Sequence, residues 1–174
     1  MTLGDALKAL GVLVPLVLLQ ITIVTPLEVA SGHPDVVLAF LVALALLRGP
    51  MLGAVAGFWA GLLLDFAALA PPGVSSLVLT LAGYWAGRFG LATTRSSPHP
   101  PLIAVALATV WVAVGLTVVN FLLGQSVPAG ELFGRVLLPT LALNVLVMFP
   151  VYRLAERLFP VVPRDRPGGA TVLA

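Results

Sequence analysis

Long apolar segments follow one another along the chain, and short turns containing proline, glycine or charged residues separate them. A membrane-spanning helix needs about 20 mainly apolar residues, because the hydrocarbon core of a bilayer is about 30 Å thick. Only 9% of the 174 residues are charged, whereas a soluble domain carries roughly 25%. So few charges cannot cover a soluble surface, and we therefore predict an all-α integral membrane protein.

Six segments are predicted to form one compact bundle of transmembrane helices within residues 1–160. They cover residues 6–27, 34–47, 51–70, 74–91, 102–123 and 131–158. The second is too short to span, since roughly 14 residues give about 21 Å of helix. We expect it to be a packed short helix or part of an irregular pair with the loop before it. Residues 92–101 are expected to form a non-helical loop because of their prolines, and residues 161–174 a disordered tail.

The basic residues favour one orientation of this bundle. Eight of the nine lysines and arginines fall on the same predicted side, namely Lys8, Arg48, Arg88, Arg95, Arg153, Arg157, Arg164 and Arg166. Cytoplasmic loops carry an excess of these residues. We therefore expect both termini to be cytoplasmic.

The sequence offers little for catalysis or for a cofactor. There is no cysteine, and the two histidines, His33 and His99, lie in loops predicted on opposite sides of the membrane. No phosphate-binding loop, nucleophile elbow or zinc spacing is present. We predict a protein that is not an enzyme, has no metal or cofactor and does not bind nucleic acid.

Polar side chains within the predicted spans are the exceptions that need an explanation. Asp65 and Arg135 fall at similar depth in the outer halves of their segments, where an isolated charge costs about 3 kcal/mol. We hypothesise an Asp65–Arg135 ion pair; the alternative is that Arg135 reaches the headgroups while Asp65 faces water. Gln20 and Asn120 also fall in outer halves. Together the four residues suggest a polar patch that opens outward.

Glycines recur every fourth residue at Gly53, Gly57 and Gly61, and again at Gly83 and Gly87. Four-residue spacing keeps them near one face of a helix. Small residues let helix backbones touch inside a membrane, where close packing drives association. The glycine faces could pack within the bundle or dock another protein, and the sequence does not separate these alternatives.

The glycines also belong to a wider pattern, which runs Gly57-Phe-x-x-Gly61-Leu-Leu-x-Asp65, then a turn with Gly73, then Gly83-Tyr-x-x-Gly87-Arg88. With the length and the expected topology, this pattern resembles the rod shape-determining protein MreD family over about residues 5–160. Gly57, Gly61 and Asp65 are the positions carried over from the family motif. The resemblance implies a scaffold subunit of the bacterial cell-elongation machinery in the inner membrane.

The partners implied by this resemblance are MreC, RodA, a class B penicillin-binding transpeptidase, and MreB on the cytoplasmic side, besides membrane lipid. The family is similar in fold to the substrate-binding S components of energy-coupling-factor vitamin transporters. An S component is therefore the alternative function. Such proteins usually dock through an Ala-x-x-x-Ala motif in the first span, whereas Ala6 and Ala9 are three residues apart here.

Overall fold

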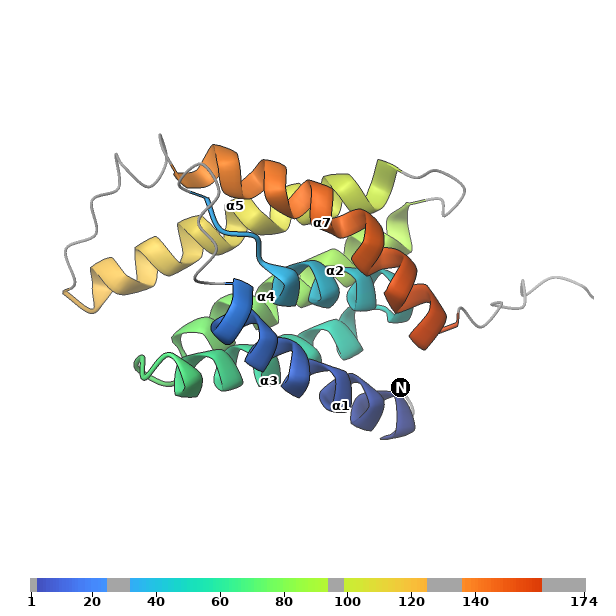
Figure 1. The fold of residues 1–174 in the computed structure, drawn as a ribbon, viewed down its shortest axis with the longest axis horizontal. Coiled ribbons are helices and arrows are strands. Elements are labelled where there is room, and N and C mark those ends of the chain that lie inside the picture. The colour runs from blue at the N-terminus through green and yellow to red at the C-terminus, as the bar shows by residue number, and fades with distance from the viewer. Residues whose placement is uncertain (1–2, 25–31, 94–98, 125–135, 161–174) are drawn as a thin grey trace, which may run out of the picture.

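The computed structural model describes residues 3–24, 32–93, 99–124 and 136–160. Within these ranges the chain forms an all-α bundle, which confirms the predicted fold class (Figure 1). The helices are α1 (Leu3–Leu19), the π-helix η1 (Gln20–Val24), α2 (Val36–Arg48), α3 (Pro50–Ala67), α4 (Val74–Ala92), α5 (His99–Leu122) and α7 (Leu137–Leu158).

Within the described ranges, four helical stretches are long and apolar enough to cross a membrane: Leu7–Val24, Pro50–Ala67, His99–Leu122 and Leu137–Leu158. Their many exposed large apolar side chains suit a lipid environment better than water. The predicted tail, at residues 161–174, lies outside the described residues.

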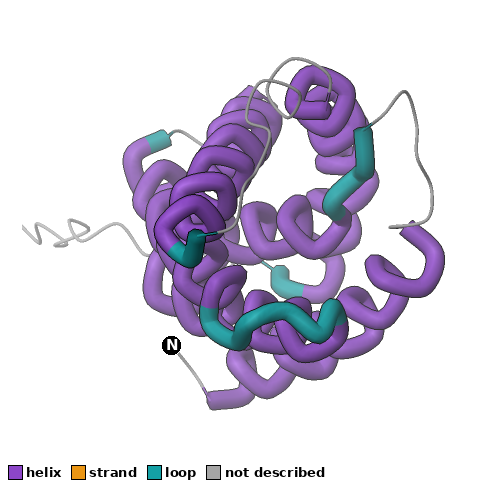
Figure 2. Tube along the Cα trace, turned by 90° about the vertical axis from the view of Figure 1, so that its left-hand side faces the viewer, coloured by secondary structure: helices purple, strands orange, loops and turns teal. Residues whose placement is uncertain are grey.

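The short helix α2 forms the centre of the bundle (Figure 1), whose described residues are helices joined by loops (Figure 2). Every residue from Val37 to Leu47 is buried, and α3, α4, α5 and α7 all pack around the helix. A helix that is apolar on all sides requires such surroundings. Its 13 residues give about 20 Å, so α2 covers only part of a membrane thickness, as the sequence predicted.

Local residues determine where the helices reverse. Gly49 ends α2 with φ of 96°, a conformation that glycine adopts readily, and Pro50 opens α3 at the position where a proline is tolerated. The expectation of a non-helical loop through residue 101 was wrong, because α5 begins at His99. Pro100 and Pro101 occupy its first turn, where the missing backbone N–H has no helical partner to lose.

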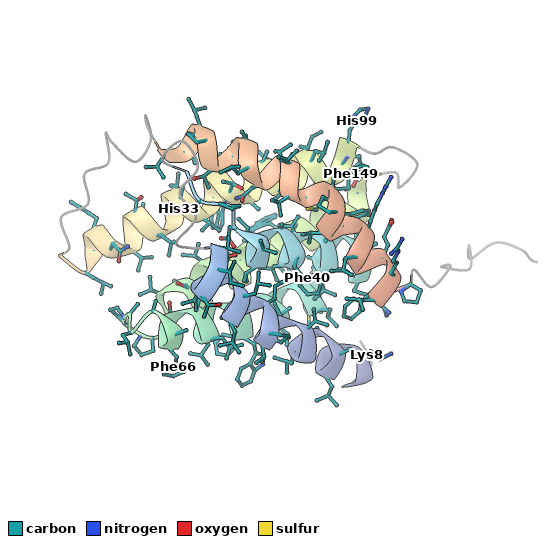
Figure 3. The ribbon with its side chains drawn as sticks, viewed as in Figure 1. Lys8, His33, Phe40, Phe66, His99 and Phe149 are labelled. Atoms are coloured by element: carbon teal, nitrogen blue, oxygen red, sulfur yellow. The ribbon has the colours of Figure 1, made fainter. Side chains whose placement is uncertain are left out.

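Both described ends of the chain lie at the same end of the bundle (Figure 1). Lys8 and His99 are seen there in Figure 3, while Phe66 lies at the opposite end. Arg48 directly precedes the α2–α3 turn at this end, and Arg153 and Arg157 lie near the end of α7. We call it the basic end.

Candidate functional site

The predicted glycines lie where α3 and α4 touch, and we call this contact the glycine seam. It comprises Gly53, Gly57, Gly61, Gly83 and Gly87. A Cβ atom added to Gly53 would overlap the carbonyl oxygen of Gly83, and one added to Gly83 would overlap that of Gly53. Gly57 faces the carbonyl of Leu79 in the same way. The two backbones therefore touch directly along this part of the hairpin.

The seam continues toward both ends of the hairpin. Gly61 lies against the backbone of Ser76, and a Cβ on Gly87 would come 2.5 Å from the Cα of Pro50. Close backbone approach is what small residues permit between membrane helices. Because α4 occupies this face of α3, a partner helix cannot use the same face without displacing it.

Asp65 lies beyond the glycine seam, at the end of the bundle opposite to the basic end. Its side chain is 1% exposed. Its Oδ2 accepts a hydrogen bond from the backbone N–H of Gly73 at 2.7 Å, and both oxygens lie 3.2 Å from the backbone nitrogen of Ser75. The first N–H groups of a helix lack helical partners and carry a partial positive charge. Asp65 thus caps α4 from the preceding helix.

These hydrogen bonds offset part of the free-energy cost of burying the Asp65 carboxylate. Arg135 lies outside the described residues, so the proposed Asp65–Arg135 ion pair stays a prediction. A carboxylate has about four lone-pair sites, and the bonds to Gly73 and Ser75 leave room for a further donor. Asn120 is half-buried near the end of α5, and its side chain has no hydrogen-bond partner within the described ranges.

Gln20 belongs to a different site, which the sequence reasoning did not find. Its side-chain amide donates to the carbonyl of Pro34 at 3.0 Å, and its side-chain oxygen accepts from the N–H of Val36 at 3.0 Å. The segment 32–35 precedes α2 and is not helical. Gln20 therefore replaces hydrogen bonds that the backbone would have made within a helix if residues 32–35 were helical.

Asn144 holds the same segment from the other side. Its side-chain oxygen accepts from the N–H of Asp35 at 2.6 Å, and its amide donates to the Thr109 hydroxyl at 3.0 Å. The Thr140 hydroxyl accepts from the N–H of His33 at 3.3 Å. Non-helical backbone at membrane depth is tolerated only where protein groups satisfy it. The sequence signal was Pro34 and Asp35 placed before a run too short to span.

A small cavity of about 150 Å³ adjoins this network between α2, α5 and α7. Asp35, Thr109, Thr117, Thr140 and Asn144 supply its polar lining. Sites for small molecules usually enclose about 300–1,000 Å³. A volume of about 150 Å³ is too small for a vitamin-sized ligand.

The described residues contain no group of three or more His, Cys, Asp or Glu side chains that could hold a metal ion. What the described ranges do contain is a tightly packed hairpin, a buried central helix and an apolar exterior. These features define an all-α membrane protein with closely packed helices.

Comparison with family models gives the assignment. The model described as rod shape-determining protein MreD matches residues 6–161, which is nearly the whole chain, and the chain belongs to this family. Membership implies a role in determining the rod shape of the cell, within the MreBCD shape machinery. Comparisons with curated proteins and with solved structures each gave no match.

Proposed function

We propose that the chain is a non-enzymatic scaffold of the cell-elongation machinery that binds MreC in the plane of the bacterial inner membrane. RodA, a class B penicillin-binding transpeptidase and MreB would join the same assembly. The observation that carries the proposal is the family match over residues 6–161. In this proposal the basic end faces the cytoplasm, because lysine and arginine are enriched on that side.

The packing of the bundle supports a scaffold role. A scaffold must hold its binding face in a fixed geometry, and backbone contact along the glycine seam leaves α3 and α4 little freedom to slide. The central helix α2 is held by packing against α3, α4, α5 and α7. Gln20 donates a hydrogen bond to the segment before it and Asn144 accepts one from that segment, and these bonds fix its position.

The seam also limits where MreC can dock. The glycine face of α3 is covered by α4, so a single-pass partner helix must use an outer face of the bundle. Large apolar side chains are exposed on several outer faces, among them Leu18 on α1, Leu107 on α5 and Leu146 on α7. Each presents a lateral surface of the kind that a membrane helix packs against.

Co-purification with MreC from detergent tests the proposal. The chain has no native cysteine, so single cysteines can be introduced at Leu18, Leu107 and Leu146 without background. Paired with cysteines along the MreC helix, they should form disulfides on one face of the bundle only. Absence of a complex, or equal cross-linking on all faces, would count against a specific scaffold.

The S component alternative gives a different result in the same preparation. A purified S component would carry a vitamin-like ligand, detectable by mass spectrometry after denaturation. The cavity beside Asp35 is smaller than such a ligand requires. Finding a bound vitamin and no MreC complex would replace the scaffold proposal.

A further inference from the structure

A groove of about 600 Å³ lies between α4 and α5, and its lining includes Leu107, one of the three exposed positions named above for cross-linking to MreC. Four buried alanines form its floor, namely Ala82, Ala86, Ala104 and Ala108. Trp85, Leu107 and Trp111 stand along it as walls and are 60%, 60% and 42% exposed. The groove is therefore apolar and open at the side of the bundle.

Among the described residues that line this groove, Arg88 is the cation, and it lies at the basic end. Arg88 lines it and is exposed, and no carboxylate in the described ranges forms an ion pair with it. Arg88 precedes the end of α4 by four residues, which places it about 6 Å from that end. The neighbouring Gly87 packs against Pro50 in the α2–α3 turn. Arg88 thus lies at the depth expected for lipid headgroups.

The length of the groove distinguishes among possible occupants. Its deepest residue on α5, Trp111, is 12 residues from His99, or about 18 Å along the helix. Beyond this point α4 and α5 close together: the Trp111 indole donates to the carbonyl of Val78 at 3.2 Å, and a Cβ on Gly115 would come 2.9 Å from Val78. The groove therefore covers little more than half of the ~30 Å hydrocarbon thickness.

We propose that this groove binds one anionic phospholipid, with an acyl chain over the alanine floor and the phosphate at Arg88. An acyl chain reaches one leaflet deep, as the groove does, whereas a spanning partner helix would need a groove across the whole bilayer. Basic pockets between membrane helices on the cytoplasmic side are known to accept anionic headgroups. The proposal rests on the placement of the basic end in the cytoplasmic leaflet, not on MreC binding.

The three tryptophans of the chain allow a direct test. Trp85 and Trp111 line the groove, while Trp59 lies on α3, away from it. In a Trp59→Phe variant the fluorescence comes from Trp85 and Trp111 and reports on the groove. In a Trp85→Phe/Trp111→Phe variant it comes from Trp59 and reports on bulk lipid. Each is reconstituted alone in phosphatidylcholine vesicles with increasing phosphatidylglycerol carrying brominated chains, because bromine quenches indole fluorescence at near contact.

Phosphatidylglycerol should quench the groove tryptophans at a mole fraction about fivefold lower than it quenches Trp59, the change expected for one basic side chain near the surface. Arg88→Gln should abolish this difference. Arg153→Gln is the matched control: it removes a charge on α7, where Arg153 stacks 4.2 Å from the Phe149 ring centroid, and it should keep the difference. Equal effects of the two substitutions would overturn the proposal.

A second pair of variants tests the acyl-chain part. Ala92 lines the groove and is exposed, so Ala92→Phe should fill it without disturbing the core and should remove the preference for phosphatidylglycerol. Val118→Phe, on an exposed part of α5 outside the groove, should not. If brominated phosphatidylcholine quenches the groove tryptophans as well as phosphatidylglycerol does, the proposal fails. Loss of MreC co-purification in Ala92→Phe would then assign the groove to the partner helix.

Discussion

Replacing Gly57 by alanine tests whether backbone contact in the glycine seam holds the bundle together. The new methyl group would overlap the carbonyl oxygen of Leu79, which belongs to the α4 backbone and cannot rotate away. The helices α3 and α4 would have to separate. Gly11 on α1 is the matched control, because a Cβ added there meets no atom within 4 Å.

The magnitude follows from two opposing effects. Alanine favours a helix over glycine by up to about 1 kcal/mol, and this gain applies to both sites. At Gly57, however, separating the helices by about 1 Å forfeits a quarter to a half of the dispersion energy at each contact along the seam. Overpacking of this kind costs about 1–3 kcal/mol. We expect Gly57→Ala to lower the free energy of unfolding by about 2 kcal/mol, and Gly11→Ala to leave it unchanged or raise it.

The assay is reversible unfolding in mixed micelles as the denaturing detergent increases, followed by circular dichroism. Wild type, Gly57→Ala and Gly11→Ala are compared at the same protein-to-detergent ratio. Equal unfolding free energies for the two variants would refute the reasoning, since the two sites differ in what their Cβ atoms meet. Rod shape of cells carrying each variant supplies a second readout, and only Gly57→Ala should round the cells.

Three further predictions use the same unfolding assay. Asp65→Ala should cost about 2 kcal/mol because the α4 N-terminus loses its cap, whereas Asp65→Asn keeps an acceptor and should cost about 1 kcal/mol; equal losses would contradict the charge–dipole part. A double-mutant cycle of Asp65→Asn with Arg135→Gln should give a coupling energy above about 0.5 kcal/mol if the ion pair forms, and additivity would reject the pair. Asn144→Leu should cost about 1–3 kcal/mol by leaving the N–H of Asp35 unpaired, while Thr109→Val should cost about 0.6 kcal/mol; the reverse order would exclude this role for Asn144.

These predictions address two different stabilising devices within the bundle. The glycine seam relies mainly on shape, because the absence of side chains at the glycines lets the two backbones come into contact. The network around residues 32–35 relies on hydrogen bonds that Gln20 donates to and Asn144 accepts from this segment. Only the second lets the chain enter a short helix in the middle of an apolar bundle, since an unpaired backbone group there costs several kcal/mol.

Several features of the molecule were predictable because they depend on local sequence. The apolar runs predicted helices, and the predicted starts of α3 and α4 agreed within one residue, where Pro50 and Gly73 mark the turns. The predicted end of α3 at residue 70 lies three residues beyond its observed end at Ala67. The start of α5 was missed because proline was taken as a helix breaker, although it fits the first turn. The spacing of Gly53, Gly57 and Gly61 predicted a close-packed helix face, but not that α4 would be the helix packed against it.

The roles of the polar residues required the tertiary structure. The sequence places Asp65 and Gln20 at similar depth in their helices. Depth alone does not say which neighbouring helix each side chain faces. Folding places the Asp65 carboxylate on the N-terminus of α4 and Gln20 on the segment before α2. Asp65 rather than a neighbouring serine caps α4, since the Ser76 hydroxyl donates to the carbonyl of Phe58.

By itself the sequence determined that this protein belongs in a membrane, because its composition cannot make a soluble surface, and that its helices can approach closely, because glycines repeat at helical spacing. Only the tertiary structure decided which surfaces that proximity joins. The seam is closed by α4, the centre is filled by α2, and a groove ending at Arg88 is left open between α4 and α5. Hydrophobicity is additive along a chain and can be read from it, whereas packing partners depend on how the helices turn relative to one another.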